Sequence, residues 1–353
     1  MIKVMIVDDS ALVRQVLTEI LSMPSDIEVI ATASDPVFAE KKIQQQKPDV
    51  IVLDLEMPRM DGITFLKKLM QDNPIPVVIC ASLSVQATRR TMDALAAGAI
   101  AVVAKPAQEL KQALPGISQQ LVQAIRAAVK SNPRFMLSAP DTVRTETHLP
   151  AATKQIAWEL VLIGASTGGT QAIENILRQL PDDCPGIVVV QHMPAGFTAA
   201  FAERLNTLYH LEVQEAYSGA RVQRGRILIA PGGKQLSVQR DAQGYFTEVR
   251  VAPPVNRHCP SVDVMFDSAS AFKSDRIAAI LLTGMGSDGA KGLLSLRQAK
   301  SITFAQDEQS CVVFGMPKEA IKLGAVCYQL PLGSVAQAIA GDLSGAVPLL
   351  SPV

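Results

Sequence analysis

Three side chains in the second half of the chain could together carry out acyl transfer, because each follows a separate apolar stretch. Ser166 lies in Gly-Ala-Ser-Thr-Gly, the G-x-S-x-G pattern in which small neighbours let a serine occupy a sharp turn between a strand and a helix. His192 and Asp288 each follow a further apolar stretch. A hydroxyl that an imidazole activates, beside a carboxylate that orients the imidazole, is a nucleophile for acyl transfer. The sequence therefore predicts Ser166 as nucleophile, His192 as general base and Asp288 as orienting acid.

The candidates for the general base are few, because the chain has four histidines. His148 lies in a stretch rich in proline and threonine, and His210 follows the end of a helical pattern. His258 is the rival of His192, since it could line a substrate cleft or cap a turn. No histidine follows Asp288, and this order disfavours an ordinary α/β-hydrolase, in which the histidine comes after the acid.

The same segments are also compatible with roles outside hydrolysis. Taken alone, the acid could cap a helix and the histidine could be a packed residue at a strand end. Gly284, Gly286 and Gly289 spell G-x-G-x-x-G between a strand and a helix, with Asp307 after the next strand. This pattern is typical of a dinucleotide site. The alternatives to a hydrolase are therefore a dinucleotide-dependent enzyme that uses Gly284–Gly289 and a non-enzymatic protein that only binds its partners.

A second set of reactive residues lies in the first half of the chain. Asp8 and Asp9 follow the first apolar stretch, Asp54 follows the third and Lys105 follows the fifth. In an open parallel sheet, neighbouring strands bring their carboxyl ends to one crevice. Converging carboxylates repel one another unless a hard cation neutralises them, and Mg²⁺ prefers oxygen ligands. The sequence predicts a Mg²⁺ site beside a lysine, where one carboxylate can accept a phosphoryl group.

Short apolar runs separated by helical patterns must position both sets of residues. Such alternation predicts parallel sheets with helices on both faces. The first half contains the runs 4–7, 29–33, 50–53, 77–80 and 100–103, followed by a helical stretch over 107–130. The second half contains the runs 160–163, 187–190, 227–229, 278–282, 302–305 and 325–328. Residues 205–260 have a less regular pattern that could contain antiparallel hairpins.

The predicted fold class is α/β, with two doubly wound parallel-sheet domains. Residues 1–130 form a five-stranded domain, and residues 156–350 form a larger Rossmann-like domain. Residues 131–155 contain prolines, threonines and mixed charge without an apolar period, which is the composition of a linker.

Composition narrows the class of protein. The chain has 353 residues with 33 basic and 33 acidic side chains, so no net field favours nucleic acid or an anionic membrane. No apolar run reaches the roughly 20 residues of a membrane span, and we expect no direct membrane insertion. The five cysteines are scattered without a C-x-x-C pair, which is typical of reduced thiols. A cytoplasmic protein without a nucleic-acid partner is expected.

The first half resembles the receiver domain of two-component response regulators. The resemblance rests on the segments Val7–Ser10 (VDDS), Leu53–Gly62 (LDLEMPRMDG) and Ala104–Pro106 (AKP). It implies that Asp54 is phosphorylated and that Lys105 contacts the phosphoryl group. It also implies the Mg²⁺ ligands, which are Asp8, Asp9, Asp54 and the backbone carbonyl of Glu56.

Two positions depart from the receiver pattern. Ala81 stands where the family has a hydroxyl residue at the end of the fourth strand, with Ser82 next to it, and Val102 stands at the usual aromatic position. Because phosphorylation needs the acids and the metal, these departures concern how the signal leaves the site.

Apart from the linker, the whole chain resembles the chemotaxis protein-glutamate methylesterase family. The matching segments are Gly164–Gly169 (GASTGG), Gln191–Pro194 (QHMP), Ala230–Gly233 (APGG), Arg257–Phe266 (RHCPSVDVMF), Leu281–Gly289 (LLTGMGSDG) and Val312–Ala320 (VVFGMPKEA). The resemblance assigns the triad to Ser166, His192 and Asp288. It further implies oxyanion or substrate contacts from Thr167, Met285 and His258. Cys259 stands where the family often has arginine, which implies a different substrate groove.

By this resemblance the chain is a phosphorylation-regulated serine hydrolase; the alternative is a non-enzymatic response regulator that only binds receptors or a kinase. The hydrolase would remove methyl groups from glutamate γ-methyl esters of chemoreceptors and deamidate receptor glutamines. The implied partners are methylated chemoreceptors and a chemotaxis histidine kinase as phosphodonor. Mg²⁺ would serve the first domain, and the hydrolase would need no cofactor. The unphosphorylated first domain would cover the active site, and phosphorylation of Asp54 would loosen it.

Overall fold

The computed structural model describes residues 1–57, 61–105, 110–131 and 157–349. The chain divides into two units, residues 1–138 and 139–353, and each is described by itself. Residues 132–155 of the predicted linker lie outside the described residues. No helix in the described part combines the length and apolar character needed to cross a bilayer.

The N-terminal unit contains a five-stranded sheet in the order β2-β1-β3-β4-β5, with every neighbouring pair parallel. Its strands are β1 (Ile2–Val7), β2 (Ile27–Ala33), β3 (Val50–Leu53), β4 (Val77–Ala81) and β5 (Ala101–Ala104). Strands β3 and β4 are apolar and buried over their whole length, as expected for a sheet that helices cover on both faces. The sheet matches the five-stranded domain predicted from the sequence.

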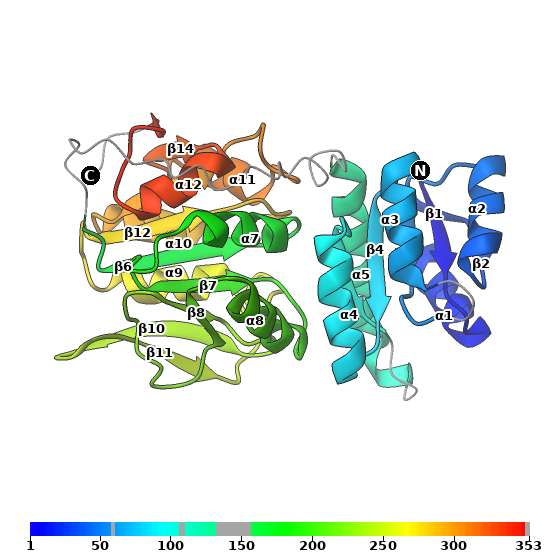
Figure 1. Cartoon of the computed structure of the whole chain (residues 1–353), viewed down its shortest axis with the longest axis horizontal. Helices are drawn as coiled ribbons and strands as arrows, with labels where there is room; N and C mark the ends of the chain where they lie inside the picture. Colours follow the sequence, from blue (N-terminus) through cyan, green and yellow to red (C-terminus); the bar gives the residue numbers. More distant parts are fainter. Residues whose placement is uncertain (58–60, 106–109, 132–156, 350–353) are drawn as a thin grey trace. The chain divides into compact units, whose positions relative to one another are not determined.

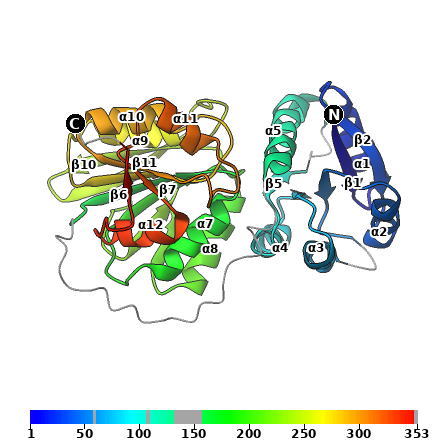
Figure 2. The same ribbon diagram turned by 90° about the horizontal axis from the view of Figure 1, so that it is seen from above.

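Short polar side chains begin the helices of this unit. Ser10, Asp35, Asp61 and Ser84 each accept a backbone N–H of the first turn, which satisfies donors that the helix itself leaves free. The helices are α1 (Ala11–Ser22), α2 (Pro36–Gln45), α3 (Gly62–Asp72), α4 (Val85–Ala96) and α5 (Leu110–Lys130). Helices α3 and α4 lie on one face of the sheet and α5 lies on the other (Figure 2).

The C-terminal unit contains an eight-stranded sheet in the order β15-β14-β13-β12-β6-β7-β9-β8, in which only β15 is antiparallel to its neighbour. Its strands are β6 (Leu160–Ala165), β7 (Ile187–Gln191), β8 (Glu212–Glu215), β9 (Arg226–Ile229), β12 (Ile277–Leu281), β13 (Ile302–Gln306), β14 (Tyr328–Leu330) and β15 (Val347–Pro348). Strands β10 (Gln235–Asp241) and β11 (Gly244–Arg250) form a separate antiparallel hairpin within the irregular region. Figure 1 shows β12, β6 and β7 side by side at the centre of this unit.

Two layers of helices enclose the large sheet (Figure 2). One layer holds α9 (Val262–Ser270), α10 (Ala290–Gln298) and α11 (Met316–Lys322). The other holds α7 (Gly169–Gln179), α8 (Phe197–Leu208) and α12 (Leu332–Ile339). The core between the first layer and the sheet is aliphatic and aromatic, with Leu162, Phe266 and Leu281 fully buried.

One predicted strand was misplaced. The apolar run 325–328 predicts a strand, but β14 begins only at Tyr328. Ala325 donates its N–H to Ala320 at the end of α11, so this part of the run closes a helix instead. Ala325 and Val326 are buried all the same, and burial alone does not distinguish a strand from a packed loop.

Candidate functional site

The predicted nucleophile and base follow adjacent strands in register. Ala165 at the end of β6 pairs with Gln191 at the end of β7, so Ser166 and His192 come next on neighbouring strands. The N–H of His192 donates to Ala165 O at 3.0 Å. On the other side of β6, the N–H of Ser166 donates to Thr283 O at 3.1 Å, in the loop that follows β12. The carboxyl edge of the sheet therefore brings together all three segments that carry the predicted triad.

The turn that carries Ser166 is packed too tightly for side chains larger than those present. Gly168 has a φ of 80°, which favours glycine, and a Cβ there would lie 2.5 Å from Val312 Cβ. A Cβ at Gly284 would lie 2.7 Å from Ser166 Cβ and 2.4 Å from Met316 Sδ. Gln191 also binds the turn, donating from Nε2 to Ser166 O at 2.9 Å and to His192 O at 3.2 Å. The backbone around the serine is thus fixed by several independent contacts.

The imidazole of His192 is hydrogen-bonded to the carboxylate of Asp288. The distance from Nε2 to Oδ2 is 2.8 Å, and both side chains are almost fully buried. Because an ionised carboxylate only accepts hydrogen bonds, Nε2 carries the hydrogen and Nδ1 carries the free lone pair. Nδ1 is buried and has no hydrogen-bond partner in the described part of the chain. This nitrogen is therefore the available acceptor for a proton.

Asp288 accepts hydrogen bonds from four donors. Oδ2 accepts His192 Nε2 and the N–H of Val262, and Oδ1 accepts Asn256 Nδ2 and Ser261 Oγ, all at 2.7 or 2.8 Å. Burial would raise the pKa of Asp288, but the hydrogen bonds from His192, Asn256 and Ser261 outweigh it and lower the pKa. Asp288 is consequently a permanent anion that orients His192 rather than a proton carrier.

A second carboxylate shares one of these donors. Asn256 Nδ2 also donates to Asp263 Oδ2 at 2.7 Å, and Asp263 Oδ1 accepts the N–H of Gly292 at 2.7 Å. Burial raises the pKa of Asp263, and the nearby charge of Asp288 adds to this effect. Asn256 therefore screens two buried carboxylates from each other.

The predicted oxyanion residues lie in the loops next to Ser166. Thr167 and Met285 are both half-buried, and within the described ranges their backbone N–H groups donate to no protein acceptor. The carbonyl of Thr167 accepts Thr283 Oγ1 at 3.0 Å, which fixes the orientation of this turn. Free N–H groups at this edge can stabilise an anion.

His258 lies flat against His192. The ring centroids are 3.7 Å apart and the ring planes differ by 4°. Burial, and next the proximity of His192, lower the pKa of His258 to about 3. The sequence left open whether His258 lines a cleft or caps a turn; in the structure its ring stacks on the predicted base.

Two of the three glycines in the pattern at 284–289 make close packing contacts with neighbouring residues. Gly284 makes room for Ser166 and Met316, whose atoms a Cβ would meet. Gly289 precedes α10 with a φ of 87°, and a Cβ there would lie 2.7 Å from atoms of Leu281 and Val262. These contacts explain two of the three glycines without a dinucleotide.

The acidic cluster of the N-terminal unit forms at the carboxyl edge of its sheet. Ligand oxygens of Asp8, Asp9 and Asp54 lie within 4.8 Å of one another. Lys105 Nζ lies 2.9 Å from Asp8 Oδ2 and 2.7 Å from Asp54 Oδ2. Three converging carboxylates with one lysine leave an excess of negative charge among oxygen donors. This donor set fits Mg²⁺.

Burial dominates the electrostatics of Asp54. It raises the pKa of Asp54, and the ion pair with Lys105 offsets it only in part. For Lys105, burial would lower the pKa, but the hydrogen bonds and charges of Asp54 and Asp8 raise it. Lys105 is therefore a fixed cation beside a carboxylate that still lacks full compensation of its charge.

The two positions that depart from the receiver pattern carry apolar side chains, which cannot form a hydrogen bond at the carboxyl edge of the sheet. Ala81 is buried at the end of β4, and Val102 is half-buried in β5. The hydroxyl of Ser82 points to another partner and donates to Glu56 Oε2 at 3.2 Å. The Glu56 N–H donates to Asp54 Oδ1 at 3.2 Å, which places this residue beside the cluster.

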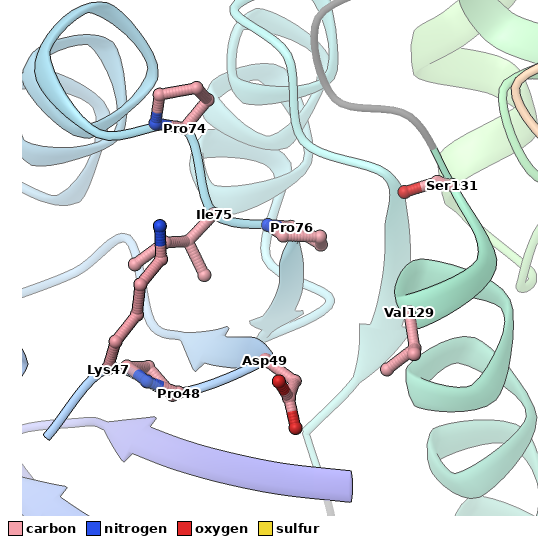
Figure 3. A pocket seen from close by; sticks show the side chains of 8 residues that line it. All are labelled: Lys47, Pro48, Asp49, Pro74, Ile75, Pro76, Val129 and Ser131. Atoms are coloured by element: carbon pink, nitrogen blue, oxygen red, sulfur yellow. The ribbon is translucent and has the colours of Figure 1, made fainter.

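One pocket of about 500 Å³ lies at the opposite edge of the receiver-like sheet (Figure 3). Its lining residues are Lys47, Pro48, Asp49, Pro74, Ile75, Pro76, Val129 and Ser131. Lys47 donates to Asn73 Oδ1, and Asp49 accepts the N–H of Lys3. Both charged groups of the lining are therefore paired within the N-terminal unit, Lys47 with the end of α3 and Asp49 with β1.

Several residues that complete the candidate active site were not predicted from the sequence. Asn256, Ser261 and the N–H of Val262 contact Asp288, and Gln191 joins the two reactive turns. The segments RHCPSVDVMF and QHMP contain three of these four residues. No spacing rule indicated which of their side chains point at the acid.

Comparison with known proteins identifies a family for each of the two units. The family described as CheB methylesterase matches residues 161–339, and the response regulator receiver domain matches residues 4–115. A protein-glutamate methylesterase/protein-glutamine glutaminase 2 of Hahella chejuensis is 51% identical over 350 residues, covering 96% of this chain and 95% of the relative. The protein of the same name from Xanthomonas campestris is 53% identical over 351 residues, covering 96% of this chain and 100% of the relative.

A solved structure supports the same assignment for the C-terminal unit. The crystal structure of the Thermotoga maritima CheB methylesterase catalytic domain is 37% identical, with a TM-score of 0.50, and the match covers 52% of this chain and 98% of that domain. The fold, the matched families and the full-length relatives agree: the chain belongs to the CheB methylesterase family and carries a response regulator receiver domain before its catalytic domain.

Proposed function

We propose that Ser166, His192 and Asp288 are the triad with which this member of the family hydrolyses glutamate γ-methyl esters of chemoreceptors. The relatives that match over nearly their whole length are named for this activity and for glutaminase activity. The observation that carries the residue assignment is the hydrogen bond from His192 to Asp288, beside the turn of Ser166. Because the carboxylate accepts four donors, its own position is fixed, and with it the position of His192 Nε2.

Acylation begins when His192 Nδ1 takes the proton of Ser166 Oγ. Oγ bonds to the ester carbon, and the developing oxyanion is stabilised by backbone N–H groups near Thr167 and Met285. The bond from carbon to the methoxy oxygen then breaks. The proton on Nδ1 passes to that oxygen, and methanol leaves.

Deacylation repeats the steps with water. His192 takes one proton from water, the hydroxide bonds to the acyl carbon, and Oγ leaves with the proton from Nδ1. The product is a glutamic acid side chain, which releases its proton to water and becomes the carboxylate, and free Ser166. With a glutamine side chain the same steps release ammonia in place of methanol, which is the glutaminase reaction.

The receiver domain supplies the regulation. We propose that a chemotaxis histidine kinase donates the phosphoryl group to Asp54 and that Lys105 contacts its oxygens. Asp8, Asp9, Asp54 and the carbonyl of Glu56 would hold Mg²⁺, which neutralises the charge of the transferring group. Methylated chemoreceptors would be the substrate, and the protein would act on their cytoplasmic parts.

The test is methanol release from methylated receptor membranes, with and without a small-molecule phosphodonor, beside Ser166→Ala. We expect release that requires Ser166 and increases with the phosphodonor. Release that persists in Ser166→Ala would remove the nucleophile assignment. Absence of release from receptors of the matching organism would favour a protein that only binds its partners.

A further inference from the structure

The segment from Val255 to Val262 supports the predicted base and acid from one side. Asn256, Ser261 and the N–H of Val262 contact Asp288, while His258 contacts His192. The hydrogen bond to Asp288 is the one hydrogen bond of the His192 ring within the described ranges, because Nδ1 has no partner there. A single hydrogen bond fixes one atom of a ring but leaves the tilt of its plane free. The flat contact with His258 fixes the plane as well.

His258 is itself held rigidly. Its N–H donates to Val255 O at 2.8 Å, and its carbonyl accepts the N–H of Val255 at 3.0 Å. The same carbonyl accepts Gln235 Nε2 at 3.0 Å, and Gln235 Oε1 accepts the N–H of Ser261 at 2.8 Å. Gln235 is 2% exposed. The backbone that carries the ring is therefore tied to Val255 and Gln235 by three hydrogen bonds.

The charges around His258 argue against a role as a second proton carrier. The titratable and charged groups near it are His192, Asp288 and Arg257. Burial, His192 and Arg257 lower the pKa of His258, Asp288 raises it, and the result is about 3. At neutral pH the ring is uncharged. When His192 holds the proton of Ser166, an uncharged neighbour does not repel it, whereas a second cation at 3.7 Å would.

We infer that His258 is a positioning residue whose ring covers one face of His192 and holds it in the plane that the Asp288 hydrogen bond and proton transfer require. This inference rests on the proposed triad. It differs from the expectation of a substrate contact, because a positioning residue acts on kcat and a substrate contact acts first on KM.

The experiment compares His258→Ala and His258→Phe with the wild type in the full-length chain, activated by phosphodonor. We expect His258→Ala to lower kcat for methanol release about 10- to 100-fold, with KM changed less than about twofold, since small misplacements of reacting groups cost up to about 100-fold. His258→Phe restores a flat ring and should recover most of kcat.

The matched control is His210→Ala, which removes an exposed histidine. The wild type and Ser166→Ala, measured in parallel, test the proposed function, and the two His258 variants are interpreted against them. A thermal unfolding midpoint separates loss of folding from loss of positioning. A raised KM with unchanged kcat in His258→Ala would overturn the inference in favour of a substrate contact. Equal loss in His258→Phe would also overturn it, because the imidazole itself would then be needed.

Discussion

Asp54 of the receiver domain and Asp288 of the catalytic domain invite a direct comparison. Each follows a strand at the carboxyl edge of a parallel sheet, and each is 2% exposed. Yet the pKa of Asp54 is raised and that of Asp288 is lowered. Since burial acts in the same direction on both, the difference comes from their neighbours.

The neighbours explain the opposite outcomes. Asp288 accepts four hydrogen bonds that satisfy both oxygens. Asp54 accepts one longer N–H bond on Oδ1, and its Oδ2 shares Lys105 with Asp8. Part of the charge of Asp54 is therefore left uncompensated, as the proposed phosphoryl acceptor and cation ligand requires. The charge of Asp288 is stabilised by its four donors, as the proposed orienting acid requires.

The largest effect is expected from Asp288→Asn. An amide in place of the carboxylate presents a donor or a weaker acceptor to His192, so the imidazole loses the tautomer with a free Nδ1. We expect kcat for methanol release to fall about 10⁴-fold, as loss of the orienting acid does in serine hydrolases. The matched control is Asp263→Asn, which alters the neighbouring carboxylate that does not contact His192. Similar losses in both variants would contradict the assignment of Asp288.

The second prediction concerns Asp54→Asn. It removes the proposed phosphoryl acceptor, so we expect the whole increase with phosphodonor to disappear while activity without phosphodonor remains. Asp49→Asn, at the opposite edge of the same sheet, is the control and should keep the increase. The readout is the ratio of initial rates with and without phosphodonor. An increase that survives in Asp54→Asn would refute the regulatory proposal.

The third prediction concerns the amide between the two carboxylates of the catalytic domain. Asn256→Ala leaves Asp288 and Asp263 each without one donor, and an unsatisfied buried group costs about 1–3 kcal/mol. We expect a kcat about tenfold lower and a lower unfolding midpoint. Asn256→Asp adds a third carboxylate and should be worse than Asn256→Ala on both measures. If Asn256→Asp were the milder change, the electrostatic role of this residue would be wrong.

The fourth prediction concerns Ala81, at the end of β4 in the receiver domain. Ala81→Ser places a hydroxyl at the end of β4, where receiver domains resembling this one have such a group. One hydrogen bond of about 1 kcal/mol to the phosphoryl group would shift the balance of two conformations about fivefold. The ratio of rates with and without phosphodonor should rise by up to this factor. Ser82→Ala is the control, since that hydroxyl contacts Glu56 instead.

The smallest effect is expected in stability as a function of pH. Because the folded-state pKa of Asp54 is raised, its ionised form weakens the folded state as pH rises through that pKa. Asp54→Asn should therefore stabilise the receiver domain at neutral pH, and the gain should vanish in acid. For Asp288 the sign is opposite: its stabilisation is present above its unfolded pKa of 3.8 and is lost as pH falls. Domain unfolding midpoints measure this, since about 1 kcal/mol moves the midpoint of a domain by several degrees.

The positions of the reactive residues were largely predictable, because they depend on local pattern. Asp8, Asp54 and Lys105 follow apolar runs of a parallel sheet, and the structure gathers them at one edge. His192 and Asp288 were predicted in the same way and are hydrogen-bonded. Their catalytic roles, and that of Ser166, remain predictions for the Ser166 and Asp288 variants to test.

The supporting contacts were not predictable, because they depend on tertiary packing. Asn256 and Ser261 lie in a region without helical or strand period, and Gln235 at the start of β10 holds that region in place. Nothing in the spacing of these residues indicates that their side chains turn toward Asp288. The misplaced strand at 325–328 has a related cause, since a buried apolar run packs equally well as a loop.

The buried side chain of Gln235 also limits how the enzyme can diverge. Its side chain donates to Pro253 O and His258 O and accepts the N–H of Ser261. These three hydrogen bonds together require a fixed number of residues between 253 and 261. An insertion or deletion within that stretch must break at least one of these bonds and displace the residues that hold the base and the acid. Val251, two residues earlier, is 85% exposed and lies outside this limit. Insertions and deletions should therefore accumulate before Pro253, while the stretch from 253 to 261 keeps a constant number of residues.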